Sequence, residues 1–232
     1  DRFGIGSPWY KKYYYRYGLR RKAEQISRDS IFDLAVFHHQ SAQALTKGSD
    51  MANAVKEYAL AALYYRRFLD QYPYNEESYK VRYYLSDALF FSGDFDKAGW
   101  EFSIVRDHRY KDEFRNDAAF KAMNAYLKVW DLAKEEKIAP TYRAEDVLSL
   151  KGKKFEPYEI SIPTLKYLYA LDRFVKTNPE DKQVAAVAYK AMEAFYSHLH
   201  FDLARKRGED LIIRYPDNIV AEYAMDLIVN TY

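Results

Sequence analysis

The sequence predicts an all-α fold built from repeated helical hairpins, and three observations support this prediction. Only 8 Gly and 7 Pro occur among 232 residues, which is few for a sheet protein that needs many tight turns. Apolar residues recur in steps of three and four, the spacing of one helical face. Two separate stretches also share one internal spacing after a proline, which indicates a structural repeat.

The repeat is measured from prolines that follow an aromatic or polar residue: Tyr72-Pro73, Asn178-Pro179 and Tyr215-Pro216. Phe95 lies 22 residues after Pro73, and Phe201 lies 22 residues after Pro179. Pro179 and Pro216 are 37 residues apart. Ala98 and Ala204 lie equally far along the chain after Pro73 and Pro179. Ala61 lies twelve residues before Pro73, as Ala204 lies twelve residues before Pro216. Equal spacing in separate places predicts two-helix units of common design.

The helix after each proline carries the expected core stripe, which consists of Val81, Leu85 and Ala88, then Val187, Ala191 and Ala194, then Ala224 and Ile228. We expect the first of these helices to end near Ser92-Gly93 and Asp94 to cap the next one. Further helices are expected over residues 30–45, 51–72 and 110–132, with Asp50 as an N-cap.

The predicted organisation has four parts: a basic, aromatic N-terminal segment over residues 1–28, a first helical-repeat block over 29–135, a linker loop over 136–160 and a second helical-repeat block over 161–232. A loop of this length is either functional or mobile. The chain starts with Asp1 rather than Met and ends inside the helix expected from Asn218. We therefore expect a processed or excised piece whose second block is truncated at its C-terminus.

Composition and motif searches argue against several classes of function. The net charge of +2 makes nucleic acid an unlikely partner for the chain as a whole, and the absence of cysteine excludes disulfides and thiolate metal sites. The adjacent His38 and His39 point about 100° apart on a helix and do not share a metal at i, i+4 geometry. No phosphate loop, nucleophile elbow or calcium loop is present. We expect no catalytic residue, cofactor or metal.

A small residue twelve positions before a proline, in paired helices, resembles the tetratricopeptide repeat. The stretches ending at Pro73 and Pro216, and the segment from Leu85 to Ala98, are similar to bacterial envelope proteins of the BamD-like and Tol–Pal coordinator (YbgF-like) types. The resemblance implies a right-handed superhelical solenoid that binds proteins in the periplasm or at the outer membrane. Tyr167 departs from the pattern, because it replaces the expected alanine and implies either a wider helix crossing or a degenerate repeat.

Two surfaces are candidate binding sites. The N-terminal segment interleaves aromatic and basic residues, of which Tyr10, Lys11, Lys12, Arg16, Arg20 and Arg21 are candidates for contact with a membrane or an anionic partner. The alternative is a lead-in helix that packs its aromatics and solvates its charges.

The helical stripe next to each core stripe is expected to line a concave groove. Its partner-binding candidates are Lys80, Tyr83, Asp87, Phe90, Tyr189, Glu193, Tyr196, Tyr223, Asp226 and Asn230. The alternative is that its tyrosines pack between repeats.

The predicted function is a non-catalytic protein–protein scaffold whose groove binds envelope proteins or peptides. Its expected location is the bacterial periplasm, and anchoring to the outer membrane through a segment outside this sequence stays open. Two alternatives stay open: a cytoplasmic repeat adaptor that uses its basic N-terminus on nucleic acid or anionic lipid, and a glycan-active helical enzyme. Partner identity and oligomeric state do not follow from the sequence.

Overall fold

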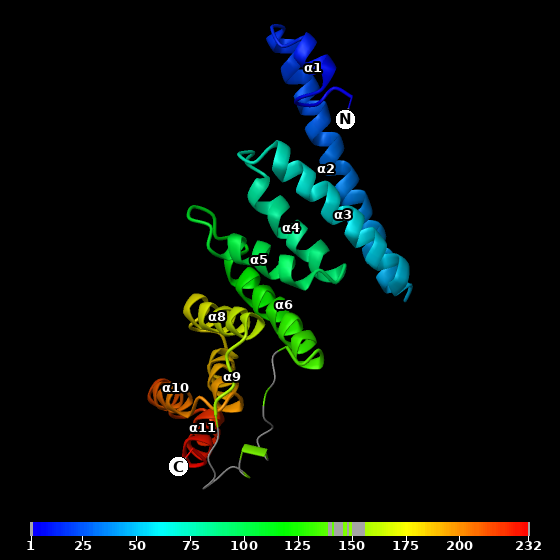
Figure 1. The fold of residues 1–232 in the computed structure, drawn as a ribbon. Coiled ribbons are helices and arrows are strands. Elements are labelled where there is room, and N and C mark those ends of the chain that lie inside the picture. Colours follow the sequence, from blue (N-terminus) through cyan, green and yellow to red (C-terminus); the bar gives the residue numbers. More distant parts are fainter. Residues whose placement is uncertain (1, 139–140, 142–145, 148, 150–155, 232) are drawn as a thin grey trace. The chain divides into compact units, whose positions relative to one another are not determined.

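The computed structural model describes residues 2–138, 141, 146–147, 149 and 156–231, and the regular structure in these ranges is helical (Figure 1). The helices are α1 (Pro8–Lys12), α2 (Tyr17–Lys47), α3 (Met51–Gln71), α4 (Ser78–Phe91), α5 (Phe95–Arg106), α6 (Arg115–Glu135), α8 (Ile162–Thr177), α9 (Val184–Ser197), α10 (Phe201–Arg214) and α11 (Ile219–Val229). The predicted all-α class is confirmed for the described residues.

The chain divides into two compact units, which are unit 1 (Asp1–Phe114) and unit 2 (Arg115–Tyr232). In unit 1, α2 packs against α3, α3 against α4, and α4 against α5. The small residue Ala61 is fully buried in α3, next to the deeply buried Tyr65 and Phe68. Because each helix packs mainly on the next one in sequence, unit 1 consists of a series of helical hairpins.

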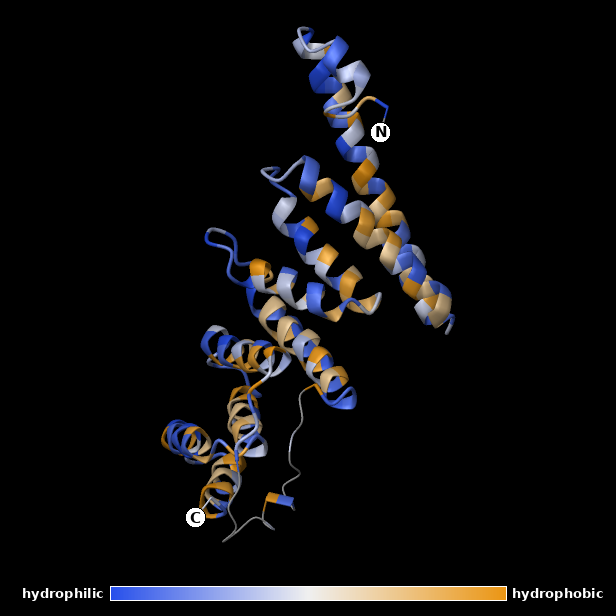
Figure 2. Ribbon diagram, in the orientation of Figure 1, coloured by the Kyte–Doolittle hydropathy of each residue, from blue (hydrophilic) through white to orange (hydrophobic). Residues whose placement is uncertain are grey.

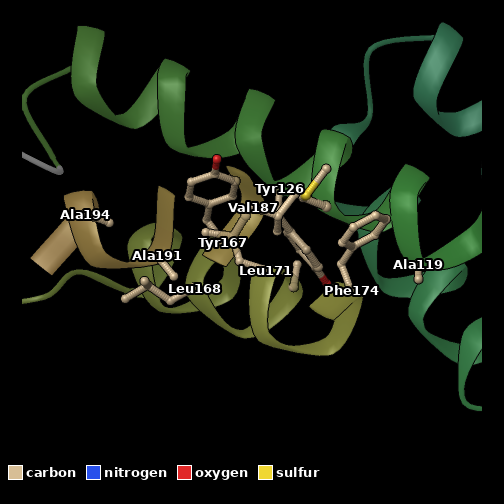
Figure 3. Close-up of a cluster of buried hydrophobic side chains, with 11 residues drawn as sticks. Ala119, Tyr126, Tyr167, Leu168, Leu171, Phe174, Val187, Ala191 and Ala194 are labelled. Atoms are coloured by element: carbon tan, nitrogen blue, oxygen red, sulfur yellow. The ribbon is translucent and has the colours of Figure 1, made fainter. Parts of the chain in front are cut away.

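Unit 2 continues the same pattern, with α6 packing on α8, α8 on α9, α9 on α10 and α10 on α11. Residues 115–135 were expected in the first block, whereas α6 belongs to unit 2. Tyr167 is buried in this core (Figure 3) and stacks on Trp130 of α6, with ring centroids 5.0 Å apart. A bulky ring therefore fills the position at which the repeat pattern expects alanine.

The spacing rule correctly predicts the burial of all the core-stripe residues except Ile228, which is only half-buried near the end of α11. Ala98 and Ala204 are fully buried, like Ala61. The core stripes of α4 and α9 are at most 3% exposed, and Ala224 of α11 is fully buried. Small side chains at these positions let neighbouring helices approach closely without leaving cavities.

Three connections between hairpins share one backbone geometry. The C-cap residues Tyr72, Asn178 and Tyr215 have φ of −131°, −121° and −132° and ψ of 55°, 56° and 53°. A following proline excludes the α-helical region at these positions and so ends each helix there. Two residues after each proline, an Asn or Asp side-chain oxygen accepts a hydrogen bond from a backbone N–H at 3.0, 2.8 and 3.1 Å. These residues are Asn75, Asp181 and Asn218, and their role was not anticipated from the sequence.

The turns within the hairpins agree only in part with expectation. The helix α4 ends at Ser92-Gly93 as predicted, with Gly93 at φ +91°. Asp94 occupies the N-cap of α5, but its side chain makes no capping hydrogen bond and instead accepts one from Lys97. Asp50 does cap α3, because its side chain accepts a hydrogen bond from the Asn53 N–H at 3.3 Å.

The two irregular segments of the prediction also differ from the observed structure. α2 starts at Tyr17 and runs through the expected boundary between residues 28 and 29. Much of the predicted linker 136–160 lies outside the described residues. At its end, the Tyr158 N–H donates to the His198 carbonyl oxygen at 3.1 Å, and His200 Nε2 lies 2.8 Å from the Tyr158 carbonyl oxygen. These two bonds fix this part of the segment to the turn between α9 and α10.

Candidate partner-binding surface

Four predicted groove residues come together on α9 and α11 of unit 2. The rings of Tyr189 and Tyr223 lie 6.3 Å apart at an interplanar angle of 60°. Glu193 follows Tyr189 by one helical turn, Asp226 follows Tyr223 by three residues, and both carboxylates are exposed. Tyr223 is 51% exposed, so one face of this pair is open to solvent. We call Tyr189, Glu193, Tyr223 and Asp226 the acidic tyrosine patch.

The electrostatics of the patch are set by its two carboxylates. Neither Glu193 nor Asp226 has an ion-pair partner among the residues that the structure describes. Partial burial, followed by the nearby charges of Glu193 and Asp226, raises the pKa of Tyr189 above its usual value of 10.0. The phenol therefore stays protonated at neutral pH and remains a hydrogen-bond donor. The patch combines aromatic surface with uncompensated negative charge, which suits a cationic ligand.

The corresponding stripe of α4 in unit 1 is largely used for internal packing. Tyr83 stacks on Phe114 with ring centroids 4.3 Å apart and an interplanar angle of 14°. Phe90 packs edge-on against Phe95 with centroids 5.3 Å apart. Asp87 is half-buried, and of the predicted residues on this helix only Lys80 is exposed. Tyr83 and Phe90 therefore pack inside unit 1, as the alternative interpretation of this stripe expects.

The predicted groove residues Tyr196 and Asn230 have different positions. Tyr196 is only 3% exposed, so its assignment to a binding surface is wrong. It lies at the end of α9, where Phe201 of the following helix packs on its ring at 5.5 Å. Asn230 is exposed at the C-cap of α11, one turn beyond Asp226.

In the basic N-terminal segment, some of the candidate residues make contacts within the protein and the others are exposed. The Tyr10 hydroxyl donates to Glu24, and the Arg20 guanidinium lies 3.7 Å from that carboxylate and 4.8 Å from the Tyr14 ring centroid. Tyr10 and Arg20 are therefore used to fold α1 back on α2. The remaining candidates in this segment, which are Lys11, Lys12, Arg16 and Arg21, are exposed.

The histidines make local structural contacts. His38 Nδ1 lies 2.7 Å from Glu57, and its ring stacks on Tyr64. His198 Nδ1 lies 2.7 Å from the Ala194 carbonyl oxygen. Within the described ranges, no three His, Asp or Glu side chains form a group suited to a metal ion.

The described helices are each too short or too polar to span a bilayer. No known protein family matches the sequence. No curated protein matches it significantly.

Proposed function

We propose that this protein is a binding scaffold whose acidic tyrosine patch holds a cationic segment of a partner protein. The proposal rests on one observation: two exposed carboxylates, which have no ion-pair partner in the described part of the chain, flank two tyrosines on the neighbouring helices α9 and α11. Arg and Lys side chains favour such a surface, because they stack on aromatic rings and pair with carboxylates.

The scaffold is further proposed to be a right-handed solenoid of the tetratricopeptide type. The shared geometry of the turns at Pro73, Pro179 and Pro216 supports this, as do the buried alanines at equal offsets. Each repeat in such a solenoid contacts mainly its neighbours, which agrees with the consecutive packing within each unit.

A location in the bacterial envelope follows as part of the proposal, and its support is the likeness of the proline-terminated repeats to envelope scaffolds. Fractionation of cells that express the protein at its native level tests it. Recovery with periplasmic or outer-membrane proteins is the expected result. Recovery with cytosolic enzymes would discard the location without affecting the patch.

The binding proposal is tested by affinity capture with the full-length protein in its native cells. The double variant Tyr223→Ala/Asp226→Asn removes an exposed ring and one charge of the patch. Tyr110→Ala/Asp112→Asn makes the same changes on an exposed loop of unit 1, where Tyr110 is 81% exposed, and is the matched control. We expect the patch variant to lose its main partner, the control to keep it, and both to retain wild-type helix content. Equal capture by all three proteins would refute the proposal.

A further inference from the structure

An apolar groove runs along the first helical hairpin of unit 1, whereas the acidic tyrosine patch belongs to unit 2. It has a volume of about 490 Å³ and is formed by the N-terminal segment, α2 and α3. Phe3 and Trp9 contribute one part of its wall, with their rings packed edge-on at 5.5 Å. Tyr64 and Arg67 contribute the part from α3.

An exposed apolar stripe on α2 lines much of the groove. Leu19, Ile26 and Leu34 all line it and are 43%, 57% and 43% exposed. Figure 2 shows polar residues over α1 and the start of α2, with apolar residues following along α2. The stripe from Leu19 to Leu34 spans about 22 Å at 1.5 Å per residue. This length matches a partner helix of about four turns, which binds such a groove through its own apolar face.

The charged side chains that line the groove are both basic. Lys22 and Arg67 are the charged side chains among its described lining residues, and no carboxylate lines it. The exposed Lys11, Lys12 and Arg21 belong to the adjoining stretch, where residues 1–28 hold eight basic and two acidic residues. One of those two acids, Glu24, is already engaged by Tyr10 and Arg20.

We propose that the groove formed by Leu19, Ile26, Leu34 and Tyr64 is a second docking site, and that it binds an acidic amphipathic helix of a partner protein. The apolar face of that helix covers the stripe, and its carboxylates meet Lys22 and Arg67. A second copy of this chain is disfavoured, because it would bring its own basic segment against these cations. A flat anionic membrane is disfavoured because the apolar residues line a hollow rather than project from a surface.

The test is a selection from a displayed library of 18-residue helices. Apolar residues are fixed at i, i+3, i+4 and i+7 positions, and all other positions are randomised. Selection on the whole chain is expected to enrich helices with a net negative charge. A selected helix, measured by fluorescence anisotropy, should bind at least tenfold more weakly to Ile26→Asp and to Lys22→Glu. Ile213→Asp in α10 replaces an isoleucine that is 77% exposed and should change nothing.

Several outcomes would overturn the proposal. Selected helices without a negative charge, or helices that bind Ile26→Asp as well as wild type, would remove the groove as an acidic-helix site. Vesicles with anionic lipid that bind the chain and displace the selected helix would assign the groove to a membrane. A concentration-dependent dimer that Ile26→Asp abolishes would assign it to a second copy. Circular dichroism of each variant verifies that a loss of binding is not a loss of fold.

Discussion

The helices α3 to α5 of unit 1 and the helices α8 to α10 of unit 2 share one spacing, but each set joins its first and third helix by an ion pair with the charges reversed. In unit 1, Arg66 pairs with Glu101 at 2.6 Å across 35 residues. In unit 2, Asp172 pairs with Arg207 across the same 35 residues, at 2.6 and 2.9 Å. These positions have equal offsets from Pro73 and Pro179, so the acid and the base have exchanged places.

The carboxylates of the two ion pairs differ strongly in burial. The Glu101 side chain is 4% exposed and accepts from both Arg66 and Arg82, whereas Asp172 and Arg207 are 47% and 32% exposed. A buried charge depends on its partners for the solvation that it has lost, while exposed charges retain most of theirs. Equal spacing therefore places side chains in register, and the surroundings of each contact set how much it contributes to stability.

The largest expected effect distinguishes these two ion pairs. The double variant Arg66→Ala/Arg82→Ala should lower the free energy of unfolding by about 3 kcal/mol, because it leaves the buried carboxylate of Glu101 without these two partners. Arg207→Ala should cost about 0.5 kcal/mol. Urea unfolding followed by circular dichroism measures both values. Similar costs for the two variants would contradict the account of their burial.

The tyrosines that lie ten residues after Pro73 and Pro179, Tyr83 and Tyr189, also differ in their packing. Tyr83→Ala should cost about 2 kcal/mol, because it removes a ring stacked on Phe114 inside unit 1. Tyr189→Ala should cost about 1 kcal/mol, because its ring is half-buried beside Tyr223. The same unfolding assay ranks them, and a larger cost at Tyr189 would show that the patch is a packing element.

The turn between α4 and α5 and the turn between α9 and α10 give a third comparison. Gly93 and Leu199 occupy equal offsets and both have positive φ, at +91° and +63°. Leu199 is also 1% exposed, so its buried side chain offsets a strained backbone. Leu199→Ala should therefore be less stable than Leu199→Gly by about 1 kcal/mol, the reverse of the usual helical order. Thermal unfolding of the two variants decides this, and an Ala variant of equal or higher stability would rule out the strain.

The smallest expected effect is a pH dependence confined to unit 2. Burial lowers the pKa of His198 below 6.5, and the nearby His200 lowers it further. The unfolded chain then binds the proton more readily, so stability from neutral His198 is complete above pH 6.5 and is lost as the pH falls through the folded pKa. Amides of α9 and α10 should exchange faster as the pH falls below 6.5, after correction for intrinsic rates. His198→Asn should remove this acceleration, and its persistence would assign the effect to another group.

Sequence reasoning predicted the fold better than the site, for a physical reason. Periodicity and proline offsets report which face of a helix is apolar, so the burial of Val81, Ala98 and Val187 followed from spacing alone. Exposure of the neighbouring stripe depends on the elements that pack over it. Phe114 lies on Tyr83, and Phe201 packs on Tyr196, and neither contact has a signal in the spacing. The apolar groove on α2 was likewise missed, since the prediction placed a boundary inside that helix.

The most direct test of the acidic tyrosine patch is site-specific photocrosslinking in native cells. A photoreactive phenylalanine derivative is placed at Tyr223 in one sample and at Tyr83 in the other. We predict a discrete crosslinked partner from position 223 and none from position 83, where the ring packs on Phe114. A partner captured from position 83 but not from position 223 would contradict the proposed binding surface.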